Sequence, residues 1–222
     1  MFRLDSDNRF RAEKLDELGW LDHSFGTRLT GHPQDSAQVA SLRQIHSDTV
    51  LFANQPGVVG QGDALVADRA GLTLAIRTAD CLPVLMADVQ NRAVAAVHAG
   101  WRGVVQEIVP KTVAAMAARF GTSAEELLIA MGPGIGPCCF EVGPEVSIQF
   151  SAFFPERDDL FTRAKVNLVE TVVRQLTRIG IQRQQIATSG LCTCCGRELF
   201  HSYRRDNDAA GRMVTVIGIR RG

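Results

Sequence analysis

Two short apolar segments joined by a turn constrain the fold most strongly. Residues 83–86 and 93–97 carry apolar side chains on both faces, and Asp88, Gln90 and Asn91 lie between them. A strand that is apolar on both faces is covered on both sides, so the two segments are expected at the centre of a sheet. The rest of the chain must then supply the layers that cover this sheet.

Hydrophobic periodicity predicts the remaining elements. The expected strands are residues 39–45, 63–66, 72–77, 127–131 and 213–219. The expected helices are residues 104–120, 144–153 and 166–179, and Ser123 with Glu126 matches a capping box for a short helical turn. Strands and helices mix without strict alternation, which predicts an α/β or α+β fold with mixed β-sheets flanked by helices. We expect a single domain over residues 1–222, beginning with a polar section over residues 1–35 in which His23 and His32 are solvated.

Charge and hydropathy argue against two classes of protein. The chain has 24 basic and 24 acidic side chains, whereas a general nucleic-acid binder carries a surplus of Lys and Arg. No apolar run approaches the roughly 18 residues of a membrane span, and the first residues lack the apolar stretch of a secretory signal. We therefore expect a cytoplasmic protein that binds small molecules, without a nucleic-acid or membrane partner, and the oligomeric state stays open. In a reducing cytoplasm its six cysteines are expected as thiols or metal ligands.

Three side chains that could bind one metal ion follow the expected strands. His46, Cys81 and His98 each lie at or just past a strand end, where the sheet fixes the backbone and the side chain can point into a cleft. Two imidazoles and one thiolate suit zinc and leave the fourth tetrahedral position open for water or substrate. The same ligand types also occur in copper sites, and a lone His or Cys beside a strand is often a core residue. From the residue types alone, these alternatives stay open.

Five segments of the chain carry further motifs. They are residues 43–47 (RQIHS), 78–85 (TADCLPVL), 96–103 (AVHAGWRG), 132–143 (GPGIGPCCFEVG) and 200–205 (FHSYRR). In this order they resemble the signature segments of the laccase-domain family, whose members are also called polyphenol oxidases or multifunctional purine nucleoside phosphorylases. The resemblance runs from about residue 38 to the end of the chain.

The resemblance implies a chemistry for the three candidate ligands. It implies a zinc site made by His46, Cys81 and His98, which would also be catalytic, and a compact fold with mixed sheets. It implies phosphorolysis of adenosine, inosine and methylthioadenosine, and deamination of adenosine, with a nucleoside and phosphate as the small-molecule partners. One departure is that the family often has Leu-Asp-Leu after the residue matching Lys165, where this chain has NLVE over residues 167–170. That departure puts in doubt a carboxylate role at this place, but not the metal centre.

Several polar side chains near the candidate ligands have both a functional and a structural interpretation. Asp63 and Asp80 could orient a ligating imidazole or act on the substrate, or they could cap turns, and the resemblance favours a catalytic role for Asp63. Arg102 follows His98 at the start of a helix and is assigned to the catalytic residues as a clamp for phosphate, with an ion pair as the alternative. Arg43 and Arg77 are assigned to substrate binding, with salt bridges as the alternative.

The other cysteines lie in two short groups. Cys138 is expected to line the substrate site, and Cys139 to be a small buried side chain, since adjacent cysteines do not easily chelate one metal. Cys192, Cys194 and Cys195 could form a second metal site or a redox device. No matching ligand quartet is evident in the sequence, which favours structural thiols.

Other functions remain as alternatives. A copper-loaded phenol oxidase is one, although five histidines are too few for the trinuclear cluster of a true multicopper enzyme. A cysteine-dependent amide hydrolase that edits peptidoglycan precursors is another, with Cys81 as nucleophile and His98 as base. The usual zinc deaminase signature, H-x-E with P-C-x-x-C, is absent, so a deaminase reaction would need a different architecture. A binding module without turnover is the fourth possibility.

Overall fold

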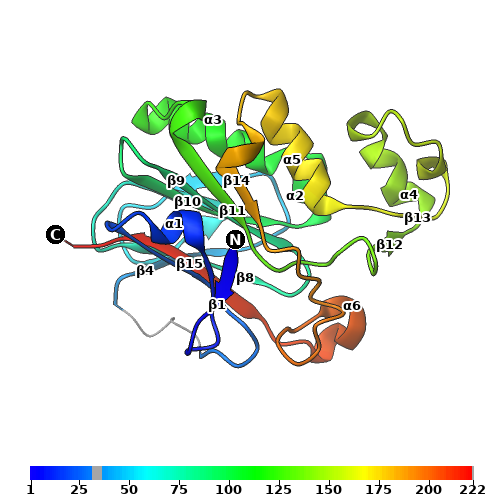
Figure 1. Ribbon diagram of the computed structural model, residues 1–222, viewed down its shortest axis with the longest axis horizontal. Coiled ribbons are helices and arrows are strands. Elements are labelled where there is room, and N and C mark those ends of the chain that lie inside the picture. Colours follow the sequence, from blue (N-terminus) through cyan, green and yellow to red (C-terminus); the bar gives the residue numbers. More distant parts are fainter. Residues whose placement is uncertain (32–36, 222) are drawn as a thin grey trace.

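The antiparallel pair of β9 (Leu82–Asp88) and β10 (Ala93–Ala99) lies at the centre of the fold, as the sequence predicts (Figure 1). The computed structural model describes residues 1–31 and 37–221. Every residue of both strands is buried, and their register places Ala96 opposite Leu85. One face of the two strands packs against helices, and the other face packs against a second sheet.

The central pair belongs to a mixed sheet. Its other strands are β5 (Val50–Phe52), β7 (Ala64–Ala67), β11 (Leu127–Met131) and β14 (Ile186–Thr188). Within the described residues the order is β14-β11-β9-β10-β7-β5. The two outermost pairs are parallel, and the pairs nearer the centre are antiparallel.

A second mixed sheet faces the first. Its strands are β1 (Phe2–Leu4), β2 (Phe10–Ala12), β3 (Leu21–Phe25), β4 (Val39–Arg43), β6 (Gly57–Gln61), β8 (Thr73–Thr78) and β15 (Met213–Ile219). Its order over residues 1–31 and 37–221 is β1-β2-β3-β15-β8-β4-β6. A small pair, β12 (Glu141–Val142) and β13 (Ala164–Lys165), stands apart from both sheets.

A layer of three helices covers the outer face of the first sheet: α2 (Trp101–Val105), α3 (Ile108–Phe120) and α5 (Leu168–Arg178). The short helices α1 (Glu13–Asp16), α4 (Pro144–Ser147) and α6 (Tyr203–Asp206) lie elsewhere, and α1 contacts β2 and β3 of the second sheet. In Figure 1, α3 and α5 lie on one side of β9 and β10, and β15 and β8 lie on the other. No helix of the described chain is both long and apolar enough to cross a membrane.

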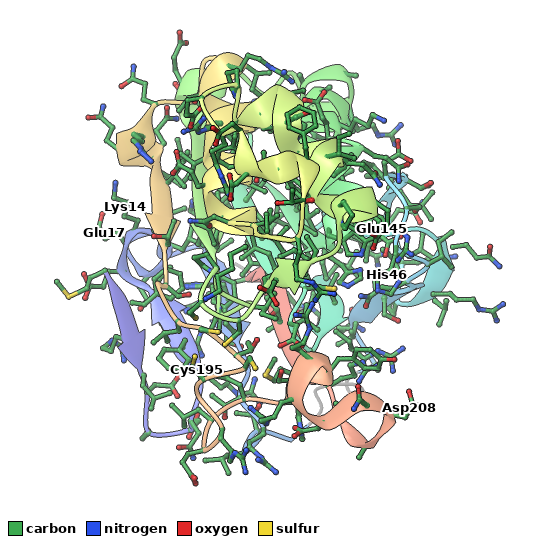
Figure 2. All side chains as sticks on the ribbon, turned by 90° about the vertical axis from the view of Figure 1, so that its right-hand side faces the viewer. Lys14, Glu17, His46, Glu145, Cys195 and Asp208 are labelled. Atoms are coloured by element: carbon green, nitrogen blue, oxygen red, sulfur yellow. The ribbon has the colours of Figure 1, made fainter. Side chains whose placement is uncertain are left out.

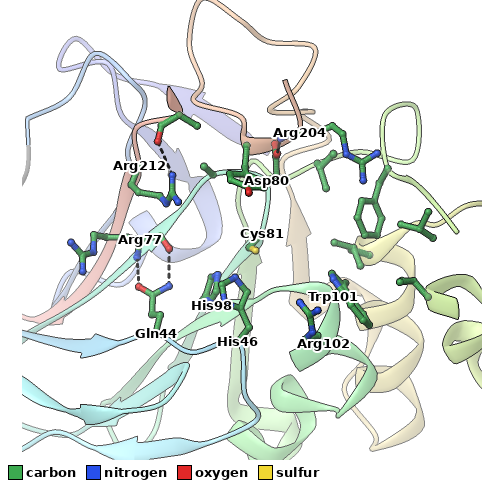
Figure 3. Close-up of a pocket in the computed structure, with 18 of the residues that line it drawn as sticks. Gln44, His46, Arg77, Asp80, Cys81, His98, Trp101, Arg102, Arg204 and Arg212 are labelled. Atoms are coloured by element: carbon green, nitrogen blue, oxygen red, sulfur yellow. Dashed lines mark hydrogen bonds between the residues drawn. The ribbon is translucent and has the colours of Figure 1, made fainter. Parts of the chain in front are cut away.

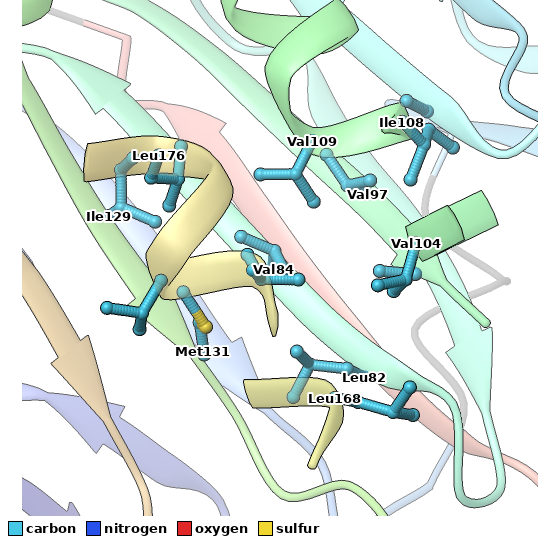
Figure 4. Packing of buried hydrophobic residues seen from close by; sticks show 14 of the residues in the cluster. Leu82, Val84, Val97, Val104, Ile108, Val109, Ile129, Met131, Leu168 and Leu176 are labelled. Atoms are coloured by element: carbon cyan, nitrogen blue, oxygen red, sulfur yellow. The ribbon is translucent and has the colours of Figure 1, made fainter. Parts of the chain in front are cut away.

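Alternate side chains of the central strands contribute to two separate cores. Val84 and Met86 pack with Val97, Val109 and Leu176 under the helices (Figure 4). The intervening residues of these strands instead join the core between the two sheets, which includes Leu85, Ala96, Leu74, Ile76 and Ile217. This alternation follows from the period-two geometry of a strand. It confirms the expected α/β class with mixed sheets flanked by helices.

The structure corrects three local predictions. The helix expected over residues 104–120 is divided into α2 and α3, because Glu107 between them has a φ of 61°. The helix expected over residues 144–153 becomes a 3₁₀ helix after Ser147. The Ser123 side chain makes no capping hydrogen bond at the 3₁₀ turn Ala124–Glu126.

His23 is buried rather than solvated, which corrects a fourth prediction. It lies in β3 with 1% of its surface exposed, and its Nε2 accepts a hydrogen bond from the Ala12 N–H at 2.9 Å. Buried apolar residues of the section surround this strand, among them Phe10, Leu15 and Phe25. The polar N-terminal section is therefore part of a core, while His32 lies outside the described residues.

The burial of His23 predicts a loss of stability in acid. Burial lowers its pKa from 6.5 to about 4, so the unfolded chain takes up a proton that the folded chain excludes. The neutral His23 side chain therefore contributes its whole share of the free energy of unfolding above pH 6.5, and this share is lost as the pH falls towards 4. The loss amounts to about 3 kcal/mol. Urea unfolding at several pH values, for the wild type and for His23→Gln, should show the steeper loss in the wild type. Parallel pH profiles for the two proteins would contradict this expectation.

Candidate metal centre and pocket

A cavity of about 1210 Å³ opens where the ends of β4, β8 and β10 meet the loops around residues 140 and 204 (Figure 3). His46, Cys81 and His98 lie together in its wall. Five arginines bring positive charge to the lining: Arg43, Arg77, Arg102, Arg204 and Arg212. Two carboxylates, Glu141 and Glu145, bring negative charge. Trp101, Phe140 and Tyr203 add aromatic surface.

The structure brings the three candidate ligands together from distant segments. His46 follows β4, Cys81 lies between β8 and β9, and His98 is in β10. One ligand atom from each lies within 4.8 Å of the other two. The two imidazole rings have centroids 4.9 Å apart and an interplanar angle of 75°. His98 is buried whereas His46 is exposed, so the group is open to the cavity on the His46 side.

Asp63 holds both histidines of this group in place. Its fully buried carboxylate accepts hydrogen bonds from the backbone N–H groups of Ile45, His46 and Ser47, at 3.3, 3.0 and 2.6 Å. It also accepts from His98 Nδ1 at 2.8 Å. Because Nδ1 is bound to Asp63, Nε2 is the His98 nitrogen that remains for Cys81 or a metal ion. Asp63 thus orients one imidazole directly and holds the turn that carries the other.

Opposing effects set the charges of these groups. Burial raises the pKa of Asp63, but hydrogen bonds from His98 and Ser47 outweigh it and hold the pKa at about 2. Burial also raises the pKa of Cys81, but hydrogen bonds from His46 and His98 lower it to about 6. Burial lowers the pKa of His98, whereas Asp63 and Cys81 raise it to about 9. A thiolate is therefore the stable form of Cys81 near neutral pH, as metal binding or nucleophilic attack requires.

The backbone beside Cys81 leaves little room for additional atoms. A Cβ at Gly100 would lie 3.1 Å from Cys81 Sγ and 3.1 Å from His46 Cδ2. A side chain at the point where β10 turns into α2 would therefore push Cys81 or His46 aside by a few tenths of an ångström, and Gly100 avoids this crowding. The donor set and this tight packing fit a small tetrahedral ion such as zinc.

Asp80 has a structural role close to the same group. It is buried with a φ of 84°, and it accepts hydrogen bonds from Thr193 Oγ1 at 2.6 Å and from the Arg204 N–H at 2.6 Å. Ser202 Oγ also donates to it, at 3.1 Å. Asp80 therefore connects the turn that carries Cys81 to the segment that carries Arg204 and Tyr203.

Arg43 and Arg77, which are expected to bind substrate, line the cavity together with Arg102, the catalytic candidate. None of them forms an ion pair with a carboxylate of residues 1–31 or 37–221. The guanidinium of Arg102 lies over the Trp101 ring, with Cζ 4.4 Å from the ring centroid. The ion-pair alternative for these side chains is therefore not observed, and their charge is free for an anion.

The structure also differs from the sequence-based expectations. Cys138 does not belong to the cavity lining, and its Sγ lies 3.6 Å from Cys195 Sγ instead. Conversely, Arg204 and Arg212 line the cavity, although the sequence predicts no site role for either. The motif over residues 200–205 was the signal that could have identified Arg204.

A family model described as multi-copper polyphenol oxidoreductase laccase matches residues 27–220. A purine nucleoside phosphorylase of Clostridium acetobutylicum is 34% identical over 181 residues, covering 81% of this chain and 76% of that protein. A purine nucleoside phosphorylase of Deinococcus radiodurans is 38% identical over 182 residues, covering 82% and 70%. Escherichia coli purine nucleoside phosphorylase YfiH is 35% identical over 184 residues, covering 79% and 72%.

Solved structures have the same fold. The crystal structure of Bacillus licheniformis hypothetical protein YfiH has a TM-score of 0.89 and 26% sequence identity, covering 99% of each chain. A Neisseria meningitidis protein has a TM-score of 0.77 and 29% identity, covering 91% of this chain and 96% of that one.

Proposed function

The chain belongs to the multi-copper polyphenol oxidoreductase laccase family, and we propose that it is a purine nucleoside phosphorylase with a zinc ion bound by His46, Cys81 and His98. The observation that carries the proposal is the open His-Cys-His group beside arginines that have no carboxylate partner among the described residues. The names of the curated relatives support the same activity. The proposed substrates are inosine, adenosine and methylthioadenosine, and the proposed location is the cytoplasm.

The cavity offers a suitable place for each part of the substrates. Phosphate is an anion that guanidinium groups bind through paired hydrogen bonds, which suits Arg43, Arg77 and Arg102. A purine is flat and partly apolar, which suits the aromatic surface of Phe140 and Tyr203. With about 1210 Å³, the cavity is large enough to hold a nucleoside and phosphate together.

The chain's own groups would act mainly by positioning. The arginines would hold a phosphate oxygen against the anomeric carbon of ribose while the bond from that carbon to the purine nitrogen breaks. Ribose 1-phosphate forms, and the purine leaves as its nitrogen takes up the proton that the hydrogen phosphate gives up. Positive charge develops on the sugar in such a transition state, so alignment of the reactants accounts for much of the rate. When bound, zinc would supply a Lewis acid with an open coordination position beside the reacting groups.

Phosphate dependence tests the proposal. We expect purified, metal-quantified protein to release hypoxanthine from inosine only when phosphate is present, with ribose 1-phosphate as the second product. Arg102→Met should raise the KM for phosphate about 10–100-fold, because a charge-assisted hydrogen bond contributes about 1.5–3 kcal/mol. The measurement is a coupled assay of hypoxanthine with phosphate and inosine varied independently.

A matched control for Arg102 is Arg119→Met. Arg119 also stacks on an aromatic ring, with Cζ 4.0 Å from the Phe52 centroid, but it lies outside the cavity lining. This variant should leave the KM for phosphate unchanged. Hypoxanthine release at the same rate without phosphate would instead indicate a hydrolase, and no release from any purine nucleoside would reject the proposal.

Adenosine deamination forms part of the same proposal and is supported only by the family resemblance. Formation of inosine from adenosine without phosphate is its test. Copper in place of zinc would favour phenol oxidation, which oxygen uptake with a phenol detects. The histidines described outside the metal group, His23 and His201, lie away from it and do not support a trinuclear copper cluster.

A second candidate function follows from the hydrogen bonds of the same group. Cys81, His98 and Asp63 form a thiolate-imidazole-carboxylate series of the kind that cysteine hydrolases use. An amide hydrolase of this type would need no metal. Amide cleavage that survives complete removal of zinc would favour it over the phosphorylase.

A further inference from the structure

A second group of sulfur atoms lies outside the cavity. Cys138 and Cys139 belong to the loop after β11, and Cys192 and Cys195 to the loop after β14. One Sγ from each of the four lies within 4.8 Å of the others. Cys195 Sγ is 3.6 Å from Cys138 Sγ and 3.4 Å from Cys139 Sγ. Figure 2 shows further sulfur atoms close to the labelled Cys195.

Backbone contacts hold the two loops together at this place. Gly134 pairs with Cys192 in a parallel bridge, and the Thr193 N–H donates to the Gly134 carbonyl at 3.0 Å. The Gly196 N–H donates to the Cys192 carbonyl at 2.9 Å, which closes the turn that carries Cys192 and Cys195. The sulfur atoms therefore meet because the fold places both loops side by side.

The cluster contains a donor that favours a thiolate. The Gly136 N–H donates to Cys192 Sγ at 3.2 Å. A Cβ at Gly136 would lie 3.3 Å from Cys138 Sγ and 3.2 Å from Cys192 Cβ, so this glycine allows the sulfur atoms to approach.

We propose that Cys138, Cys139, Cys192 and Cys195 bind a second metal ion, a zinc ion held by four thiolates. Zinc–sulfur bonds of about 2.3 Å in a tetrahedron separate neighbouring sulfur atoms by about 3.8 Å, close to the distances found here. A disulfide would bring two of the sulfur atoms to about 2.05 Å. This site corrects the expectation that no ligand quartet exists, because the partners of the C-x-x-C pair at residues 192–195 are the adjacent cysteines 138 and 139.

Charge in the surroundings agrees with a metal-thiolate centre. Four thiolates within 4.8 Å repel one another strongly, and a divalent cation offsets part of that charge. Two guanidinium groups add positive charge nearby. Arg204 donates to the Cys139 carbonyl at 3.0 Å, and Arg205 donates to the Cys194 carbonyl at 3.1 Å.

The second ion would have a structural role. None of its four ligands belongs to the cavity lining, so the centre has no access to substrate there. The loop that carries Cys138 and Cys139 supplies Ile135 and Phe140 to the cavity, and the Ile135 N–H donates to the Asp80 carbonyl at 2.7 Å. Zinc would therefore join the loop that supplies Ile135 and Phe140 to the loop after β14, whose Thr193 side chain donates to the Asp80 carboxylate at 2.6 Å.

Metal content tests this proposal independently of the reaction. We expect about two zinc ions per chain in the wild type, and about one each in Cys81→Ala and Cys195→Ser. Cys195 is exposed, so its replacement does not disturb a core. Cys194→Ser is the matched control, because Cys194 lies in the same loop but outside the quartet, and it should keep both ions.

Cobalt spectroscopy of the Cys81→Ala variant isolates the second centre. After replacement of zinc by Co²⁺, this variant should show intense thiolate-to-cobalt charge-transfer bands. The double variant that carries both Cys81→Ala and Cys195→Ser should lose these bands. Chelation of the metal should also lower the melting temperature of Cys81→Ala. The proposal is overturned if Cys81→Ala retains no metal, or if Cys194→Ser loses as much zinc as Cys195→Ser. It is also overturned if thiol titration of the chelated, denatured protein shows that cysteines of the quartet are joined in a disulfide.

Discussion

Replacing Cys81 with alanine is expected to remove zinc from the candidate centre and to lower kcat/KM for inosine phosphorolysis about 10³-fold. The thiolate is the one anionic ligand of the group, and two neutral imidazoles hold zinc much less firmly. The folded structure should change little, because the substitution removes a single sulfur atom. Zinc analysis, steady-state kinetics and thermal unfolding of the same preparations check the three parts of this expectation.

Cys194→Ser is the control for loss of a thiol elsewhere in the chain. Cys194 is partly buried and belongs to neither group of metal-binding candidates, so this variant should keep the wild-type kcat/KM. Full activity in Cys81→Ala would rule out the proposed catalytic role of this thiolate. Lost phosphorolysis with zinc retained would mean that Cys81 acts in the reaction without being needed as a zinc ligand.

The parts of the fold that the sequence predicts well are those in which local pattern and tertiary packing agree. β9, β10, β11 and β15 have apolar residues that only a covered sheet can accommodate, and the observed strands match the expected segments closely. By contrast, β5 and β14 are three-residue strands at the edges of the sheet. Their pairing depends on partners far away in the chain, so they carry little local signal.

The candidate metal group could be predicted from the sequence for a related reason. His46, Cys81 and His98 follow or end segments with clear strand patterns, and the ends of β4, β8 and β10 in the two facing sheets bring these residues together. The cysteine quartet gives no such signal, because its two halves lie in loops with no regular pattern and are joined by the packing of β11 against β14. The burial of His23 could not be predicted from local pattern either. Polar residues flank it in the sequence, and its strand β3 is buried only because it pairs with β15, far away in the chain.

Replacing Asp63 with asparagine is expected to weaken zinc binding about 10–100-fold, because the carboxylate orients the His98 ring and increases its basicity. The amide has one acceptor oxygen for the five groups that now donate to the carboxylate, namely His98, the Ser47 hydroxyl and the N–H groups of residues 45–47. At least one buried donor then loses its partner, which should lower the free energy of unfolding by about 1–3 kcal/mol. Competition with a zinc-binding dye and urea denaturation measure the two effects.

Asp88→Asn separates the effect on zinc from the effect on stability. Asp88 is also fully buried and accepts hydrogen bonds from the N–H groups of Gln90 and Asn91, at 3.0 and 2.9 Å. It ends β9 at the opposite end from Cys81, so its replacement should destabilise the chain without changing zinc affinity. Equal weakening of zinc binding in both variants would mean that Asp63 acts only through the stability of the fold. Weakening in Asp63→Asn alone would identify the carboxylate as the group that positions His98 for the metal.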